Sequence, residues 1–453
     1  MGTSLPRQVQ GLVAIDFVGD NLVDIRKLFI AMILVVFATA CDSLADAAPS
    51  NQTDQATAMP TAIPCPALTV AYLQDNSGQS LLYLKNGDGN ARPIGTPGSI
   101  TQVKVSPNCQ WVAYLQNNEL LLYDTRSTDV PKTVISSDYL ASLTGGSAKI
   151  VQFDFSPKNQ AIYALVSVSQ EFGDQDLFKI DLSTQLPVRP IGPGLGGKYT
   201  FSPDGACLTI TRPNQLDLYC EGYEQPQRVF DFADGCAFGI RGSPQVRWKG
   251  DSSGFYLVAP KCDGNVFSGR LVYENVDREK VPEIAVGTYS PAKFDFAGSP
   301  NDVVNISPDG NCVAHQVDNH DLRDLHVICG QNSDHVYASS PVNQLDFKCW
   351  SPDSSHFLIT MPPANAPAGS KSTYFYAKEG DPPHLLINAP ALPAYTPNNE
   401  ISGIRWIKAG LFLFLYNGGL WEGQVSNDGL PTVTNQIIAG PIKDSIYDFS
   451  APP

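Results

Sequence analysis

The first motif that could carry chemistry is Gly250-Asp251-Ser252-Ser253-Gly254, which matches the G-x-S-x-G pattern of many hydrolases. In that pattern the central serine stands on a strained turn from a strand into a helix, where a base can take its proton. Here the motif lies between two segments with the apolar alternation of strands. It also takes the place that a Ser-Pro-Asp-Gly turn has elsewhere in the chain. We therefore interpret it as a turn.

A second motif, GPGLGGK at residues 192–198, satisfies G-x-G-x-x-G and approaches a phosphate-binding loop. Such a loop needs Ser or Thr after the lysine, and a helix must follow. Tyr199 occupies that position, and the residues after it have a strand pattern. The sequence therefore predicts a loop between strands, and we predict no cofactor.

Histidines and carboxylates crowd a third segment. The residues are His315, Asp318, His320, Asp321, Asp324 and His326. A metal site needs ligands that converge in space, which neighbours in sequence do not ensure. The 6 histidines and 4 methionines of the whole chain also leave little material for a metal centre. We expect a solvated hairpin here, and we predict neither a metal site nor a catalytic residue.

A repeat supplies the elements that must position any site. A short apolar strand, a turn and a second strand recur at intervals of about 43 to 58 residues, the range of four-stranded propeller blades. A third strand follows each copy, and a weaker fourth, such as RPIGP at 189–193, precedes the next. The copies are VKVSPNCQWVAYL (103–115), FDFSPKNQAIYAL (153–165), YTFSPDGACLTIT (199–211), VRWKGDSSGFYLV (246–258), VNISPDGNCVAHQ (304–316), KCWSPDSSHFLIT (348–360), IRWIKAGLFLFLY (404–416) and YDFSAPP (447–453).

The two ends of this repeat region are complementary. The segment from Leu68 has second and third strands without a first, whereas the last residues have a first strand alone. Pairing of the ends would complete one blade and leave no free sheet edge. The sequence thus predicts an all-β fold, a single propeller of eight four-stranded antiparallel blades over residues 66–453. Because the copies near 250 and 407 are degenerate, seven blades is the alternative.

The Ser-Pro-Asp-Gly strand-turn-strand unit resembles the TolB-type (WD-like) β-propeller repeat. The resemblance covers residues 66–453 and implies the propeller fold. It implies no particular activity, because this fold hosts many unrelated functions.

The chain has 10 cysteines, and several stand at equivalent places in the repeat. Cys207 and Cys312 each follow the serine of their turn by five residues, and a cysteine recurs in each following strand. Opposed residues of an antiparallel hairpin are close enough for a disulfide. We predict the pairs Cys207–Cys220 and Cys312–Cys329, with Cys236–Cys262 and Cys65–Cys109 as further candidates. Cys349 is expected to stay free and buried.

Each innermost strand is expected to direct one side chain to the central channel, two positions before its turn. These residues are Lys104, Asp154, Thr200, Arg247, Asn305, Cys349, Arg405 and Asp448. Around the closed ring, four consecutive blades read Arg405, Asp448, Lys104 and Asp154, so that charges alternate. One interpretation is a set of ion pairs between blades. The other is a polar channel mouth that binds a ligand, with Arg247 unpaired and available to an anion.

The N-terminal segment resembles an export signal. Arg26 and Lys27 precede an uncharged run at 28–40, which is shorter than the roughly 20 residues of a membrane span and typical of a signal peptide. The run ends at Cys41 in a sequence that resembles a lipobox, which predicts lipid attachment there. Ala38 departs from the usual aliphatic residue, so the alternative is a plain signal peptide. We assign residues 1–41 to the signal, with translation expected to begin near residue 22, and 42–65 to a flexible tether.

The net charge of −15 argues against nucleic acid as a partner. Together these features predict an extracytoplasmic protein, at the cell surface or in the periplasm, that contacts the membrane only through its lipid anchor. Its expected function is to bind an envelope protein, a peptide or a glycan, or to act as a scaffold. The alternative is a hydrolase or lyase that acts on polysaccharide or peptide at the axial face.

Overall fold

The computed structural model describes residues 65–76, 79–144, 148–168, 175–212, 215–231, 245–263, 266–276, 294–297, 304–330, 335–342, 344–362, 372–378, 380–386, 401–425 and 431–451. All of them belong to one compact unit, residues 62–453. None of the helices in these ranges is long and apolar enough to cross a membrane. The predicted signal and anchor at 1–41, and residues 42–64 of the tether, lie outside the described residues.

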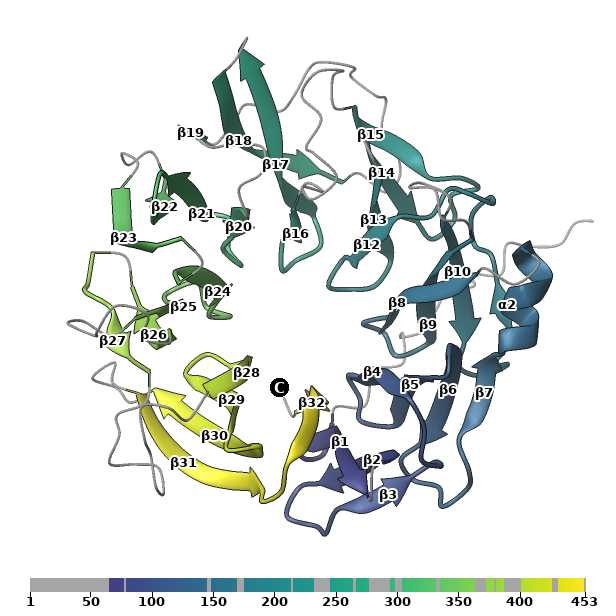
Figure 1. The fold of residues 1–453 in the computed structure, drawn as a ribbon. Helices are drawn as coiled ribbons and strands as arrows, with labels where there is room; N and C mark the ends of the chain where they lie inside the picture. The colour runs from purple at the N-terminus through teal and green to yellow at the C-terminus, as the bar shows by residue number, and fades with distance from the viewer. Residues whose placement is uncertain are drawn as a thin grey trace, which may run out of the picture. The chain divides into compact units, whose positions relative to one another are not determined.

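The described residues form eight four-stranded antiparallel sheets, arranged as the blades of an eight-bladed β-propeller (Figure 1). The fold class is therefore confirmed, and the degenerate copies near 250 and 407 each form a full blade, which excludes the seven-bladed alternative. The innermost strands are β4 (Ile100–Val105), β8 (Lys149–Phe155), β12 (Lys198–Phe201), β16 (Val246–Trp248), β20 (Val304–Ile306), β24 (Asp346–Trp350), β28 (Ile401–Lys408) and β32 (Ile442–Ser450).

The other three positions of each blade follow in sequence order. The second strands are β5 (Trp111–Gln116), β9 (Ala161–Ser167), β13 (Cys207–Arg212), β17 (Gly254–Asp263), β21 (Cys312–Asn319), β25 (Phe357–Met361), β29 (Leu411–Tyr416) and β1 (Thr69–Asn76). The third are β6 (Glu119–Asp124), β10 (Gln175–Asp181), β14 (Gln215–Cys220), β18 (Val266–Asn275), β22 (Leu322–Cys329), β26 (Thr373–Ala377), β30 (Gly419–Val425) and β2 (Gln79–Asn86). The outer are β7 (Lys132–Ile135), β11 (Pro187–Val188), β15 (Gln227–Asp231), β19 (Phe294–Ala297), β23 (His335–Pro341), β27 (His384–Leu385), β31 (Pro431–Ile438) and β3 (Arg92–Ile94).

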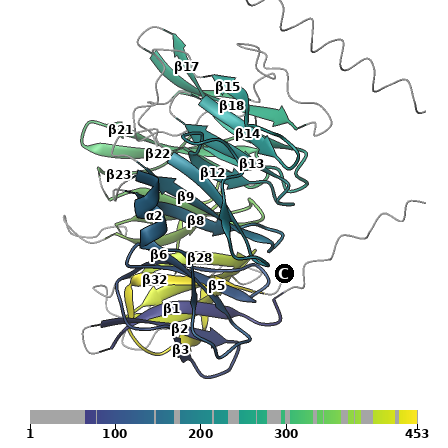
Figure 2. The ribbon, with the colours of Figure 1, turned by 90° about the vertical axis from the view of Figure 1, so that its right-hand side faces the viewer.

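The ring closes through β32, which is the innermost strand of a blade whose other strands come from the start of the repeat region. Thr69 to Tyr72 of β1 pair antiparallel with Ser450 to Tyr447 of β32. Figures 1 and 2 show the purple β1 beside the yellow β32. The predicted closure by the two ends of the repeat region is thus confirmed.

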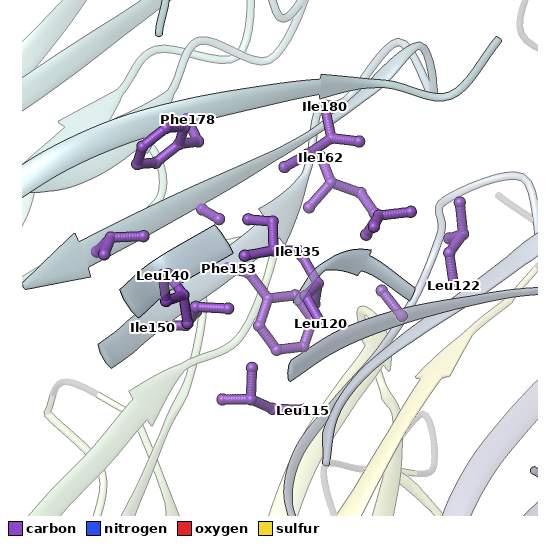
Figure 3. Packing of buried hydrophobic residues seen from close by; sticks show 14 of the residues in the cluster. Leu115, Leu120, Leu122, Ile135, Leu140, Ile150, Phe153, Ile162, Phe178 and Ile180 are labelled. Atoms are coloured by element: carbon purple, nitrogen blue, oxygen red, sulfur yellow. The ribbon is translucent and has the colours of Figure 1, made fainter. Parts of the chain in front are cut away.

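The hydrophobic core lies between the faces of neighbouring blades. Strands β5 and β9 are buried along nearly their whole length, because each has another blade on both sides. Leu120 and Leu122 of β6 and Phe153 of β8 belong to one such cluster (Figure 3). Helix α2 (Ser137–Thr144) adds Leu140 to the same cluster and covers it near the outer strands. Blade stacking therefore stabilises each sheet on both faces.

The serine of each Ser-Pro turn is buried and holds the turn together. In the third copy, Ser202 Oγ contacts Asp204 Oδ1 at 2.7 Å and accepts a hydrogen bond from the Cys207 amide at 2.9 Å. Ser307 makes the same two bonds, with Asp309 and Cys312. The fourth turn residue has positive φ, for example 66° at Gly205, where glycine is favoured. The motif is therefore a rigid link between the first and second strands.

A hydrogen bond that the sequence did not predict joins the turns of neighbouring blades. Where the fourth turn residue is not glycine, its side chain can accept a bond from the turn amide of the preceding blade. Asn159 Oδ1 accepts from the Asn108 amide at 3.1 Å, and Ser354 Oγ accepts from the Asp309 amide at 2.9 Å. Ser252 Oγ does the same with the Asp204 amide at 3.0 Å. We call these three bonds the turn latches.

Three disulfides among the described residues reinforce the fold. Cys207–Cys220 and Cys312–Cys329 each join directly opposed residues of the second and third strands, as predicted. Cys65–Cys109 links the residue before the closing blade to the turn after β4. Among the described residues Cys349 is the free cysteine. The predicted Cys236–Cys262 bridge lies outside the residues and side chains that the structure describes.

One fourth strand was predicted at the wrong residues. The outer strand of the β8–β11 blade is Pro187–Val188, whereas the sequence suggested 189–193. Arg189 instead forms an ion pair with the buried Asp176 at 2.6 Å, and Pro190 has no amide to donate to a ladder. These two residues end the strand.

Replacing Asn159 with glycine should destabilise the ring by removing a turn latch. We expect the free energy of unfolding to fall by about 1 kcal/mol relative to the control Asn117→Gly, because the hydrogen bond from the Asn108 amide to the Asn159 side chain is lost. Asn117 also has positive φ but is exposed, so the control cancels the relief of backbone strain. Chemical denaturation of the full chain measures both. Equal losses in the two variants would show that the latch contributes nothing.

Candidate binding site in the ring of inner strands

The eight predicted channel residues all lie on innermost strands, one on each blade. Side chains of this ring therefore meet around the channel, although they come from residues 104 to 448 of the chain. The ring divides into two halves with different chemistry, a paired half and an unpaired half.

The paired half comprises Arg405, Asp448, Lys104 and Asp154. Arg405 Nη1 lies 2.7 Å from Asp448 Oδ1, and Lys104 Nζ lies 2.7 Å from Asp154 Oδ1. Asp448 Oδ2 also accepts a hydrogen bond from the Val105 amide at 2.8 Å. Each of these contacts crosses from one blade to the next, so the alternating charges of this half connect four consecutive blades.

Asp448 is the most enclosed of these carboxylates. Its side chain is 14% exposed, and burial raises its pKa, which opposes the effect of the Val105 amide and of Arg405. The Arg405 guanidinium also lies 4.9 Å from the centre of the Tyr447 ring. The Arg405–Asp448 pair is therefore a partly desolvated contact next to the closing strand.

The unpaired half comprises Thr200, Arg247, Asn305 and Cys349. Arg247 is exposed and, within the described ranges, has neither an ion-pair nor a hydrogen-bond partner. Partial desolvation lowers the pKa of its guanidinium. The Asn305 Nδ2 atom is buried and lacks a hydrogen-bond partner there. Burial raises the pKa of the Cys349 thiol to about 11, so it is protonated at neutral pH.

Tryptophans fix the backbone of this half. The Trp248 indole donates to the Thr200 carbonyl, and the Trp350 indole donates to the Asn305 carbonyl, each at 3.1 Å. Both bonds run from an inner strand to the inner strand of the preceding blade. Arg247 and Cys349, each one residue before such a tryptophan, are thereby held in place.

A pocket of about 180 Å³ lies in the unpaired half, between β16, β20 and β24. Its lining residues are Gln245, Val246, Arg247, Asn305, Ile306, Phe347, Lys348, Cys349 and Trp350. The register of β24 against β25 shifts between Phe347 and Cys349, which marks a bulge at Lys348. A bulge breaks the strict alternation of side chains, and four consecutive residues of β24, 347–350, line this pocket.

The sequence analysis predicted that Arg247, Asn305 and Cys349 face the channel, and all three line this pocket, but it did not predict Lys348 or the apolar walls. Phe347 and Trp350 looked like ordinary core positions of an inner strand. The bulge left no signal in the periodicity, because KCWSPD fits the repeat without an inserted residue. Thr200, the remaining predicted residue of this half, does not line the pocket.

The motifs that suggested catalysis have structural roles. Ser252 is 3% exposed, has positive φ and is the acceptor of a turn latch, so it is not presented as a nucleophile. The glycine-rich segment leads into strand β12, and the Gly194 amide donates to Asp176 at 2.8 Å. The hairpin at 315–326 was expected to be solvated, but only its tip is exposed, because His315 is 0% exposed and stacks on His326 at 4.8 Å between ring centres. Within the described part of the chain no three potential ligands are grouped as a metal site.

Comparison with known proteins supports no assignment beyond the fold. No family model and no curated protein matches the chain. Among solved structures, a eukaryotic initiation factor is similar with a TM-score of 0.49 at 11% identity, covering 82% of this chain and 85% of that one. An oligogalacturonate lyase in complex with manganese gives 0.45 at 12% identity, covering 68% of this chain and 85% of that one.

TolB from Acinetobacter baumannii is also similar, with a TM-score of 0.30 at 16% identity. The match covers 58% of this chain and 61% of TolB, which is less than two thirds of that protein. At such identities the likeness concerns the fold alone. The class of this protein, an eight-bladed β-propeller, therefore rests on the strand order of its own sheets.

Replacing Arg405 with methionine should destabilise the protein in a pH-dependent manner. Burial raises the pKa of Asp448 in the folded protein above its value in the unfolded chain. Protonation of Asp448 therefore adds stability that is fully present below the unfolded pKa and is lost as the pH rises through the folded pKa. Without Arg405 that folded pKa rises further. We expect a loss of about 1–2 kcal/mol near pH 8 that shrinks toward about pH 4, measured by denaturation across this range. A loss that is independent of pH would assign the role of Arg405 to packing on Tyr447.

Proposed function

We propose that this protein is an extracytoplasmic binding module, held at the membrane by a lipid at Cys41 and a tether over 42–65. The basic residues, the short apolar run and the lipobox-like sequence before Cys41 support this placement. The three disulfides found in the described part of the chain support it independently, because such bonds persist in oxidising compartments. The partner is an envelope protein, a peptide or a glycan.

The observation that carries the binding function is the unpaired half of the ring. The paired half neutralises its own charges across the blades, whereas Arg247 and the Asn305 amide have no partner in the described ranges and line one pocket. Arg247 is exposed, so its donors are available to an acceptor on a ligand, and a hydrogen bond to a charged group contributes roughly 1.5–3 kcal/mol.

The same geometry favours binding over catalysis. Hydrolysis or elimination needs an acid and a base that are free to exchange protons with a substrate. Asp154 and Asp448, the two carboxylates predicted to face the channel, are each held by a cation at 2.7 Å. We therefore propose no enzymatic step.

Replacing Cys41 with serine should move the protein from the membrane fraction to the soluble extracytoplasmic fraction, because the attachment atom for the lipid is lost. Cell fractionation followed by immunoblotting measures this distribution. Cys349→Ser, which changes a cysteine far from the anchor sequence, is the matched control and should leave the protein with the membrane. Retention of the Cys41 variant in the membrane would contradict lipid anchoring.

In-cell cross-linking of the tagged full chain, followed by detergent extraction, capture and mass spectrometry, tests the binding function. We expect one envelope component to be captured in near-equal amount and to be depleted in the Arg247→Gln variant. Arg126→Gln is the control, because Arg126 is 66% exposed and pairs only locally with Asp124. Capture of the propeller alone would count against a stable macromolecular partner. Equal capture by both variants would place the partner elsewhere on the ring.

A further inference from the structure

The pocket between β16, β20 and β24 is too small for a whole ligand. Its volume is about 180 Å³, whereas sites that enclose drug-sized molecules have roughly 300–1,000 Å³. Ile306 and Phe347 in its wall are each 5% exposed, so the wall is a fixed part of the blade packing. The pocket can therefore receive one end group of a larger molecule.

The polar groups in this pocket are mainly hydrogen-bond donors. Arg247 supplies a planar guanidinium and Lys348 supplies an ammonium. Asn305 also lines the pocket, although its Nδ2 atom is enclosed. The carboxylate of Asp346 contacts Lys348 but is not part of the lining. The guanidinium fork of Arg247 matches the two oxygens of a carboxylate.

The rest of the lining is apolar. Val246, Ile306, Phe347 and Trp350 surround the donors. The hydroxyl groups of a sugar acid would lose their hydrogen bonds to water against these side chains. An aliphatic side chain next to the carboxylate would instead gain from burial. The pocket thus selects a carboxylate attached to an apolar group.

The strands around the pocket favour a peptide as the source of that carboxylate. β16, β20 and β24 are edge strands of their sheets and lie on the inner side of the ring, so each has one edge without a strand partner in its own sheet (Figure 1). Exposed edges of this kind can pair with an extended peptide backbone. A peptide that enters along the channel could therefore place its last residue in the pocket.

We propose that this pocket binds the C-terminal carboxylate of a peptide or protein that ends in a small apolar residue. The guanidinium fork of Arg247 holds the two carboxylate oxygens, and the apolar wall receives the last side chain. This inference rests on the proposed binding function and names the chemistry of its ligand.

Calorimetry with the full chain in detergent tests the proposal, using acetyl-Ala-Ala-Val with a free carboxylate and the same peptide as its C-terminal amide. We expect the acid to bind and the amide to bind at least about tenfold more weakly, because a charge-assisted pair is lost. Arg247→Gln should weaken binding of the acid peptide by about ten- to hundredfold, whereas the control Arg126→Gln should leave its affinity unchanged. A thermal melt of each variant separates loss of binding from loss of folding.

Cys349 gives a second readout that needs no substitution, since it lines the same pocket and is the free cysteine of the described residues. Because that thiol is protonated at neutral pH, alkylation is measured by mass spectrometry at about pH 9.5, where more thiolate is present. The acid peptide should slow alkylation of Cys349, and the amide should not. Equal binding of acid and amide, or tighter binding of galacturonate than of the peptide, would overturn the assignment. If no probe binds while cross-linking still captures a partner, the proposed function stands and the pocket assignment fails.

Discussion

The antiparallel pairing of β1 with β32 is the contact on which the rest of the ring depends. All other blades consist of strands that are consecutive in sequence, but this one joins residues near 70 to residues near 448. Because every blade packs its faces against two neighbours, an open ring would expose two apolar faces at once. The Cys65–Cys109 bond lies beside this seam and ties the start of the closing blade to the next blade. Closure is therefore secured by hydrogen bonds, by packing and by a covalent link.

The closing strand also organises the charges of the channel. Asp448 belongs to β32, receives the Val105 amide from the blade on one side and faces Arg405 from the blade on the other. A carboxylate in this place connects both neighbours of the seam at once. The ion pairs of the paired half thus contribute to closure of the ring. Among the described residues the unpaired half contributes no such ion pairs, so its inner-strand residues can have other chemistry.

Much of the fold could be predicted because the repeat is local. A Ser-Pro turn between two apolar strands, and two cysteines at equivalent distances from it, contain enough information to place a hairpin and its disulfide. Closure of the ring could be predicted because each end of the repeat region lacks the strands that the other end supplies. The turn latches were not predictable, because Asn159 and Ser354 act across blades and look like ordinary turn residues. Nor could the periodicity show the bulge at Lys348, which adds a cation to the pocket lining.

Departures of the sequence from its own repeat do not by themselves mark the candidate site. The blade that carries Arg247 has Trp248 and Lys249 where most copies have an aliphatic residue or phenylalanine and then the turn serine, but the Arg405 blade of the paired half departs at the same two positions, with Trp406 and Ile407. The buried serines of the turns are hydrogen-bonded, but the Tyr114 hydroxyl of the paired half is buried without a partner among the described residues, as the Asn305 Nδ2 is. An unpartnered buried donor therefore does not by itself distinguish the two halves of the ring. What distinguishes them is Arg247, an exposed cation that has no ion pair in the described ranges, whereas the cations of the paired half are each held by a carboxylate.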